Sequence, residues 1–183
     1  MRKLVSQLFV SLDGVVESPE RWHLGYYNEE MQAAVDSQIV EADILLLGRT
    51  TYEVFAASWP TRGSDVPLAD RINSMPKLVA STTLDRLHWQ NSTLIRGNLA
   101  EEITRLKQQP GRHITISGSP TLVRSLLRDH LLDELQLLVH PVALGSGSRL
   151  FQDDRDHQPF ELIDATTFKT GVLYLAYRPL VGE

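Results

Sequence analysis

The segment that most constrains the fold of this chain is Asp43–Glu53, with the sequence DILLLGRTTYE. Its unbroken apolar run at 44–47 is typical of a strand that is covered on both faces of a sheet. Gly48 ends this run, and Thr50 and Glu53 have the spacing of a capping box, which predicts that a helix begins here. The segment therefore predicts a buried strand that leads through one glycine directly into a helix.

A tight turn from a strand into a helix can bind an anion, because free backbone N–H groups and the helix dipole point at one spot. Arg49 adds a planar guanidinium group that suits phosphate. The alternative is a well-capped surface helix whose arginine is only solvated. This segment by itself does not decide between the two interpretations.

Residues 113–123, with the sequence HITISGSPTLV, repeat the pattern of strand, glycine turn and helix. Ser119 is a predicted N-cap, and Pro120 suits the first helical position, where a missing N–H costs nothing. On one α/β sheet, both turns would face the crevice at the carboxyl ends of the strands, where nucleotides usually bind. The second turn therefore favours a nucleotide site over an ordinary surface helix.

Three hydroxyl residues, Ser81, Thr82 and Thr83, follow a predicted strand at 77–80 between the two turns. They could bind a phosphate or form a polar turn. The chain has neither the G-x-G-x-x-G pattern nor the P-loop pattern. A dinucleotide would therefore bind here without either common fingerprint.

Apolar segments of strand and helix character alternate along the chain and predict one domain over residues 1–183. The last two predicted strands are joined by Lys169–Gly171, which is a hairpin signal. We expect a mostly parallel sheet with helices on both faces and an antiparallel edge. The predicted strands are 3–10, 44–47, 77–80, 92–96, 113–117, 134–140, 160–168 and 172–177, and the predicted helices are 28–42, 51–59, 67–74, 99–109 and 120–130.

Composition excludes several classes of function. A net charge of −5 argues against nucleic-acid binding, which needs a basic face. No stretch approaches the roughly 18 apolar residues of a membrane span, and no signal peptide is recognisable, so we expect a cytoplasmic protein. The chain has no cysteine, and its six histidines lack metal-ligand spacing, so we expect no metal site.

Four short segments, in order along the chain, carry a family resemblance: Ser11–Val16, Gly48–Glu53, Ser117–Leu122, and Leu132–Leu135 followed by 141–147. Together they resemble the dihydrofolate reductase superfamily, and most closely its branch related to the reductase domain of bacterial riboflavin biosynthesis protein. The resemblance implies a three-layer α/β/α fold. It also implies hydride transfer from NADPH to a small heterocycle such as a pterin, a pyrimidine or a flavin precursor.

The resemblance also implies a role for each matching residue. Gly48, Arg49, Thr50 and Thr51 would bind phosphates, Ser117, Gly118, Ser119, Thr121 and Leu122 would bind the pyrophosphate, Ser81, Thr82 and Thr83 would meet the 2′-phosphate with Arg49, and Asp13 and Gly14 would lie at the nicotinamide end. For each glycine or hydroxyl, the alternative is that it serves only the geometry of a turn.

The substrate side departs from the family pattern. Where the riboflavin-pathway enzymes carry a lysine and an acidic residue that contact the phosphorylated substrate, this chain has Gln7 and Ser117. The weak candidates for catalysis are Asp13 and Glu29, although Glu29 also suits the first turn of a helix. Trp22 and Tyr26 could stack on a flat heterocycle or simply pack together.

Two functions from different classes therefore remain open. The chain is an NADPH-dependent reductase, or it is a member of the same fold that binds a nucleotide or metabolite without turnover. In either case we expect a two-fold homodimer that buries part of the C-terminal region formed by the hairpin and the segment Pro141–Leu150, because both are rich in β-formers and an open antiparallel edge needs covering.

Overall fold

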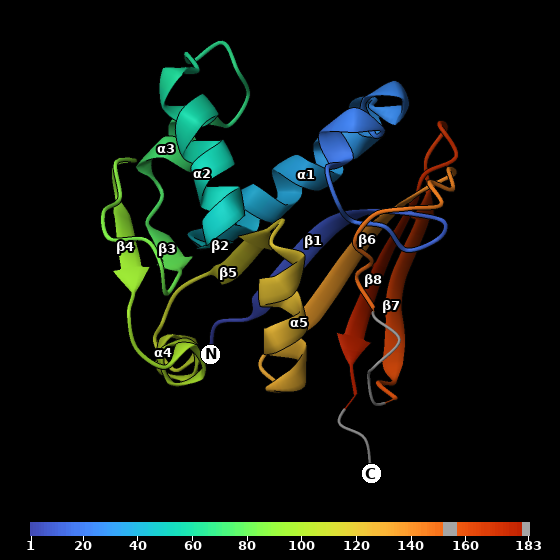
Figure 1. Cartoon of the computed structure of the whole chain (residues 1–183). Coiled ribbons are helices and arrows are strands. Elements are labelled where there is room, and N and C mark those ends of the chain that lie inside the picture. The colour runs from blue at the N-terminus through green and yellow to red at the C-terminus, as the bar shows by residue number, and fades with distance from the viewer. Residues whose placement is uncertain (152–156, 181–183) are drawn as a thin grey trace.

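The computed structural model describes residues 1–151 and 157–180. Its centre is an eight-stranded sheet in the order β4-β3-β2-β5-β1-β6-β8-β7 (Figure 1). The first six strands of this order are parallel, β8 runs antiparallel to β6, and the edge strand β7 runs antiparallel to β8. The strands are β1 Leu4–Ser11, β2 Ala42–Gly48, β3 Lys77–Ala80, β4 Ser92–Ile95, β5 His113–Ser117, β6 Glu134–His140, β7 Phe160–Thr167 and β8 Leu173–Pro179.

Helices cover both faces of the sheet, with α1, α2 and α3 on one face and α4 and α5 on the other (Figure 1). This arrangement confirms the predicted three-layer fold with its C-terminal hairpin. The helices are α1 Glu29–Glu41, α2 Arg49–Ser58, α3 Ala69–Ser74, α4 Leu99–Lys107 and α5 Pro120–Arg128, with short 3₁₀ helices at Pro19–Arg21, Leu24–Tyr26 and Trp59–Thr61. No helix in the described part of the chain is long and apolar enough to span a membrane.

Strand β2 shows why the run at 44–47 is unbroken. Ile44 and Leu46 pack with α4 and α5, whereas Leu45 and Leu47 pack with α1, α2 and α3. Successive side chains of a strand point to opposite faces, so a strand with helices on both sides needs apolar residues at every position. The prediction of a doubly buried strand is confirmed.

The parallel strands place the predicted site residues along one edge of the sheet. The carboxyl ends of β3, β2, β5 and β1 lie next to one another in this order. Gly48 is the last residue of β2, and Ser81, Gly118 and Asp13 closely follow the ends of β3, β5 and β1. Segments that are far apart in sequence therefore meet at this edge.

The predicted capping box at the start of α2 is wrong. The helix begins at Arg49, Gly48 is its N-cap residue, and no side chain caps it. Strand β2 runs as far as Gly48, so the helix starts before Thr50 and places this threonine inside the first turn. The backbone N–H groups of that turn are therefore not used by a Thr50 cap.

Candidate functional site

The two glycine turns touch each other, because β2 and β5 are neighbours in the sheet. The Gly48 N–H donates to Ser119 Oγ over 2.8 Å, and Ser119 Oγ donates to Thr51 Oγ1, also over 2.8 Å. The hydroxyl of Ser119 therefore joins the start of α2 to the start of α5. The turns at Gly48 and Gly118 thus form one continuous strip of backbone at the carboxyl edge of the sheet.

Both glycines of this strip are required by close contacts. A Cβ at Gly48 would lie 2.9 Å from Ser119 Oγ. Gly118 has a φ of +68°, and a Cβ there would lie 3.1 Å from Thr51 Oγ1. A side chain at either position would push the two turns apart, so the glycines keep the backbone open to a close neighbour.

Ser119 holds the predicted N-cap position, but its side chain does not cap α5. The residue lies in the left-handed region, with φ 57° and ψ 63°, and its hydroxyl is occupied by Gly48 and Thr51. The prediction was right about the position and wrong about the role. Contact with a second turn 68 residues away in sequence redirects the side chain.

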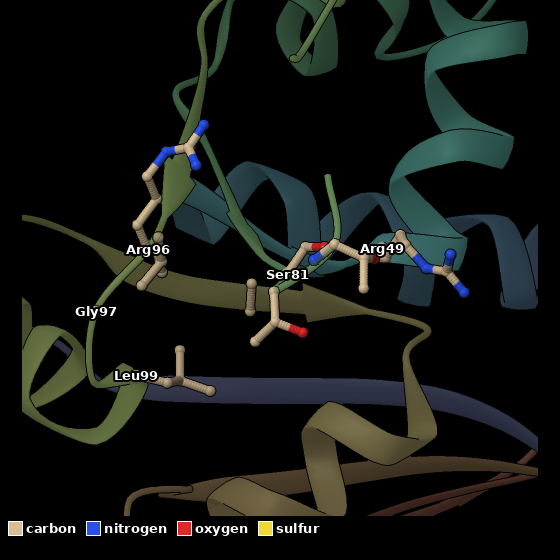
Figure 2. A pocket seen from close by; sticks show the side chains of 9 residues that line it. Arg49, Ser81, Arg96, Gly97 and Leu99 are labelled. Carbon is tan, nitrogen blue, oxygen red and sulfur yellow. The ribbon is translucent and has the colours of Figure 1, made fainter. Parts of the chain in front are cut away.

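A pocket of about 460 Å³ opens beside this strip, at the ends of β3 and β4. Figure 2 shows Arg49 and Arg96 on either side of Ser81. Arg49 is exposed and makes no hydrogen bond or ion pair with any residue that the structure describes. The pocket is lined by Arg49, Ala80, Ser81, Thr82, Thr83, Ile95, Arg96, Gly97 and Leu99.

The hydroxyls after β3 partly serve the turn itself. Ser81 Oγ accepts from the N–H groups of Thr83 (3.2 Å) and Leu84 (3.1 Å), while the side chains of Thr82 and Thr83 are exposed. Both interpretations of this segment therefore have support: a polar turn that also presents exposed hydroxyls to a pocket with two arginines.

Sequence reasoning missed Arg96. It directly follows β4 and donates to the Asp85 carbonyl over 3.0 Å. Its position at the end of a predicted strand could have indicated it, because residues just after parallel strands gather at the carboxyl edge of the sheet. The predicted strand at 92–96 includes Arg96, whereas β4 ends at Ile95 and leaves Arg96 at the edge.

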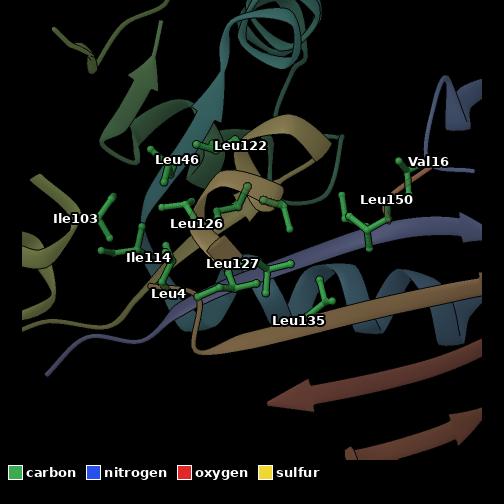
Figure 3. Close-up of a cluster of buried hydrophobic side chains, with 14 of the residues drawn as sticks. Leu4, Val16, Leu46, Ile103, Ile114, Leu122, Leu126, Leu127, Leu135 and Leu150 are labelled. Atoms are coloured by element: carbon green, nitrogen blue, oxygen red, sulfur yellow. The ribbon is translucent and has the colours of Figure 1, made fainter. Parts of the chain in front are cut away.

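The start of α5 offers backbone rather than side chains. Thr121 Oγ1 accepts from Arg124 Nη2 over 3.1 Å. Leu122 is buried and points with Leu126 and Leu127 into the cluster between α5 and the sheet (Figure 3). Leu122 can therefore serve an anion only through its N–H, at the positive end of the helix.

Asp13 and Gly14 form the turn after β1, where Gly14 has a φ of +84°. The carboxylate of Asp13 accepts from Ser11 Oγ (2.6 Å) and from the N–H groups of Leu144 (3.1 Å) and Gly145 (2.8 Å). These bonds hold the pKa of Asp13 well below its usual range, the Ser11 bond being the largest cause. Asp13 is therefore ionised at neutral pH and ties the loop after β6 to the end of β1.

Trp22 and Tyr26 gather around His140 at the end of β6, whereas Glu29 does not join them. The ring centroids of Trp22 and Tyr26 lie 5.1 and 5.6 Å from that of His140. Glu29 is exposed and lines a separate pocket of about 450 Å³ with Tyr27, Asn28, Gln32, Ala33 and Asp36. The predicted substrate residues therefore fall into two places.

Gln7 is part of the interior. It is 7% exposed, and its Nε2 donates to the Ala34 carbonyl of α1 (3.2 Å) and to Gln136 Oε1 (3.1 Å). Ser117, its partner in β5, is half-buried at the end of the strand. Gln7 thus forms a contact between α1 and the sheet.

The sheet, its helix layers and the C-terminal hairpin make up the dihydrofolate reductase type of α/β fold. Dihydrofolate reductase from Enterococcus faecalis, solved with NADP(H) and RAB-propyl, superposes with a TM-score of 0.64 at 15% identity, over 97% of this chain and 96% of that one. The chain belongs to the RibD C-terminal domain family, which it matches over residues 2–174.

Two further relatives cover nearly the whole chain. A protein from Shewanella sp. PV-4 with a provisional assignment to riboflavin biosynthesis superposes with a TM-score of 0.79 at 20% identity, over 98% of this chain and 99% of that one. The uncharacterised protein YyaP of Bacillus subtilis is 27% identical over 179 residues, which are 96% of this chain and 94% of that protein.

Proposed function

We propose that this protein is an NADPH-dependent reductase of a small planar heterocycle. The observation that carries the proposal is the joined pair of glycine turns, with Arg49 beside them. A pyrophosphate is recognised by free N–H groups at helix starts and by backbone that a ligand can approach closely. Gly48 and Gly118 bring the two helix starts together, because a Cβ at either one would meet the opposite turn.

The spacing of the strands supports an extended dinucleotide. Neighbouring strands lie about 4.8 Å apart, so the ends of β3 and β1, three strands apart, are separated by about 14 Å. Arg49, Ser81, Thr82 and Thr83 would hold the 2′-phosphate, the start of α5 would hold the pyrophosphate, and the Asp13–Gly14 turn would lie near the nicotinamide. NADPH would supply the hydride, and the protein would orient it.

The nucleotide part of the proposal is tested by affinity. We expect NADPH to bind more tightly than NADH, and Arg49→Ala to remove most of the difference. A charge-assisted contact to phosphate contributes about 1.5–3 kcal/mol, or about ten- to a hundredfold in affinity. Fluorescence titration of both nucleotides measures this effect. Arg128→Ala, an exposed arginine at the end of α5, is the control and should leave both affinities unchanged.

Equal affinity of the parent protein for NADPH and NADH would refute the role of Arg49. Turnover is tested separately, by NADPH oxidation with dihydrofolate and a panel of pterins and flavins. A protein that binds NADPH and oxidises it with no member of the panel would support the alternative of binding without turnover. Binding and turnover are tested separately because the candidate Asp13 is a poor proton donor at neutral pH, where its low pKa keeps the carboxylate ionised.

A further inference from the structure

His140 is a buried histidine with one nitrogen unused. Its side chain is fully buried at the end of β6, and Nδ1 lies 2.8 Å from the Leu138 carbonyl oxygen. A carbonyl can only accept, so Nδ1 carries the proton and Nε2 is left as an acceptor. Burial lowers the pKa of His140 despite the opposing carbonyls of Leu138 and Val10, which keeps the ring neutral. Nε2 has no hydrogen-bond partner among the residues that the structure describes.

The surroundings of His140 are aromatic. Trp22, Phe9 and Tyr26 present their rings nearly at right angles to it, with centroids 5.1, 5.5 and 5.6 Å away. Buried polar atoms in proteins are nearly always paired, so an acceptor left free in such an enclosure points to a missing donor. The missing donor is an N–H or O–H group, and the rings around it suit a flat partner.

His23 holds the place where a flat ring would lie. It comes from the loop between β1 and α1 and stacks on Phe9, with centroids 4.5 Å apart and planes at 11°. Nδ1 of His23 is also buried without a hydrogen-bond partner in the described residues. Its ring is perpendicular to that of His140, with centroids 6.2 Å apart. A ring in this position would lie next to His140, with its plane perpendicular to the imidazole.

The position of Phe9 connects this cluster to the glycine turns. Gln7 of β1 pairs with Ser117, the last residue of β5. Phe9 lies two residues further along β1, on the same face as Gln7 and just beyond the Gly118 turn. A ring stacked on Phe9 would therefore lie beside the proposed nucleotide site.

A metal ion is a poorer explanation for the two unused imidazole nitrogens. Metal sites built on histidine need three or four ligands. No group of three or more His, Cys, Asp or Glu residues with suitable geometry occurs in the described ranges 1–151 and 157–180. The aromatic walls instead suit an organic ring.

We infer that His140 is a specificity-determining residue, whose Nε2 accepts a hydrogen bond from a ring N–H of a planar heterocycle that displaces His23 from Phe9. That this ring is the hydride acceptor rests on the proposed function. The hydrogen bond to His140 and the displacement of His23 are independent of the proposed function, because they concern only the binding of the ring.

The experiment uses a matched pair of probes and no nucleotide. Lumazine is a fluorescent pteridinedione with ring N–H groups, and its N,N′-dimethyl derivative lacks them. We expect the parent protein to bind lumazine at least tenfold more tightly than the dimethyl compound, as measured by fluorescence titration. Equal binding of the two probes, or no binding of lumazine, would overturn the inference.

Two variants of His140 separate its two nitrogens. In His140→Asn the amide can still donate to the Leu138 carbonyl but has nothing at the place of Nε2, whereas His140→Gln can place its oxygen there. We expect a loss of lumazine affinity of at least tenfold in His140→Asn and of less than threefold in His140→Gln. His130→Asn, an exposed histidine with a positive φ that asparagine tolerates, is the control. Unchanged lumazine affinity in a folded His140→Asn protein would contradict the assignment.

His23→Ala tests the displacement and keeps the inference testable if His140→Asn does not fold. Removing the ring that occupies the site should raise lumazine affinity severalfold, a gain that a merely structural histidine would not give. Lower affinity in His23→Ala would overturn the displacement. A separate titration with NADPH distinguishes the two proposals: if lumazine binds through His140 and NADPH does not bind, the proposed function fails and this inference stands.

Discussion

At the scale of the residue, Ser119 shows how one hydroxyl joins two segments. Left-handed backbone costs a non-glycine residue about 1–2 kcal/mol, so a serine there needs compensation. The compensation is the pair of hydrogen bonds to Gly48 N–H and Thr51 Oγ1. The side chain serves the contact between the turns rather than its own helix.

Two substitutions of Ser119 separate strain from bonding. Both Ser119→Ala and Ser119→Gly lose the bridging hydroxyl, but glycine also relieves the left-handed strain. We expect Ser119→Ala to be destabilised by about 2 kcal/mol, and Ser119→Gly by about 1 kcal/mol less than that. Urea unfolding of the three proteins measures these differences. Equal stability of the two variants would show that the strain is absent.

Asp13 predicts a pH dependence. Its folded-state pKa lies below the ordinary value of 3.8, so the ionised carboxylate stabilises the folded state above about pH 4, and this contribution is lost as the pH falls further. We expect Asp13→Asn to lower the Tm at pH 7, and the difference from the parent to shrink as the pH falls below about 4. Asp129→Asn, at an exposed helix end, should show no such trend. A Tm difference that is constant with pH would contradict the role of the carboxylate.

At the scale of the element, Tyr52 fixes the segment between β3 and β4 to helix α2. The ring is buried, and its hydroxyl oxygen accepts from the backbone N–H groups of His88 (2.9 Å) and Trp89 (3.1 Å). The sequence placed Tyr52 near the start of a helix but gave no sign of these acceptor contacts. The same connecting segment receives Arg96 through the Asp85 carbonyl, so the shape of the pocket depends on it.

Tyr52→Phe tests this connection. Removing only the hydroxyl leaves two N–H groups without their acceptor, which costs about 1–3 kcal/mol for a buried group. We expect a loss of about 2 kcal/mol in the free energy of unfolding, measured with urea. Tyr27→Phe removes a hydroxyl that donates to Gln32 Oε1 at the surface, where water can replace it, and should change stability by less than about 0.5 kcal/mol. If the two variants lose the same stability, Tyr52 has no anchoring role.

At the scale of the whole molecule, the C-terminal hairpin leaves an open edge. Strand β7 pairs with β8, and no other strand in the described residues pairs with it. Leu162 and Ile163 on this strand are 53% and 39% exposed, and Leu173 on β8 is 36% exposed. Exposed, apolar edge strands are sites of pairing with another chain. We therefore expect a homodimer through β7.

The dimer predicts a particle of twice the 20.6 kDa chain mass at micromolar concentration. Leu162→Glu should shift it to the monomer, because the substitution places a charge in the contact. Val54→Glu, at an equally exposed apolar residue on α2, should leave the mass unchanged. Analytical ultracentrifugation distinguishes these outcomes, and a monomeric parent protein would refute the expectation.

Much of the fold could be predicted from local patterns. The strands at 77–80, 113–117 and 134–140 have the predicted bounds, because apolar runs ended by glycine, proline or hydroxyl residues mark short buried strands. The predicted helix at 28–42 is present as α1, which Asn28 caps by accepting from the Met31 N–H. The caps of α2 and α5 could not be predicted, because the Gly48 N–H and the Ser119 hydroxyl bond to each other across two turns that are distant in sequence.

The sequence by itself determined which segments become strands and helices, and that glycine turns and hydroxyls follow several strands. These features depend on periodicity and turn chemistry within a few residues. Only the tertiary structure decided that β2 lies beside β5, that Gln7 faces α1, and that His140 is enclosed by rings with one nitrogen unpaired. Strand order and packing join residues that are tens of positions apart, so which groups remain free for a ligand becomes visible only when the chain is folded.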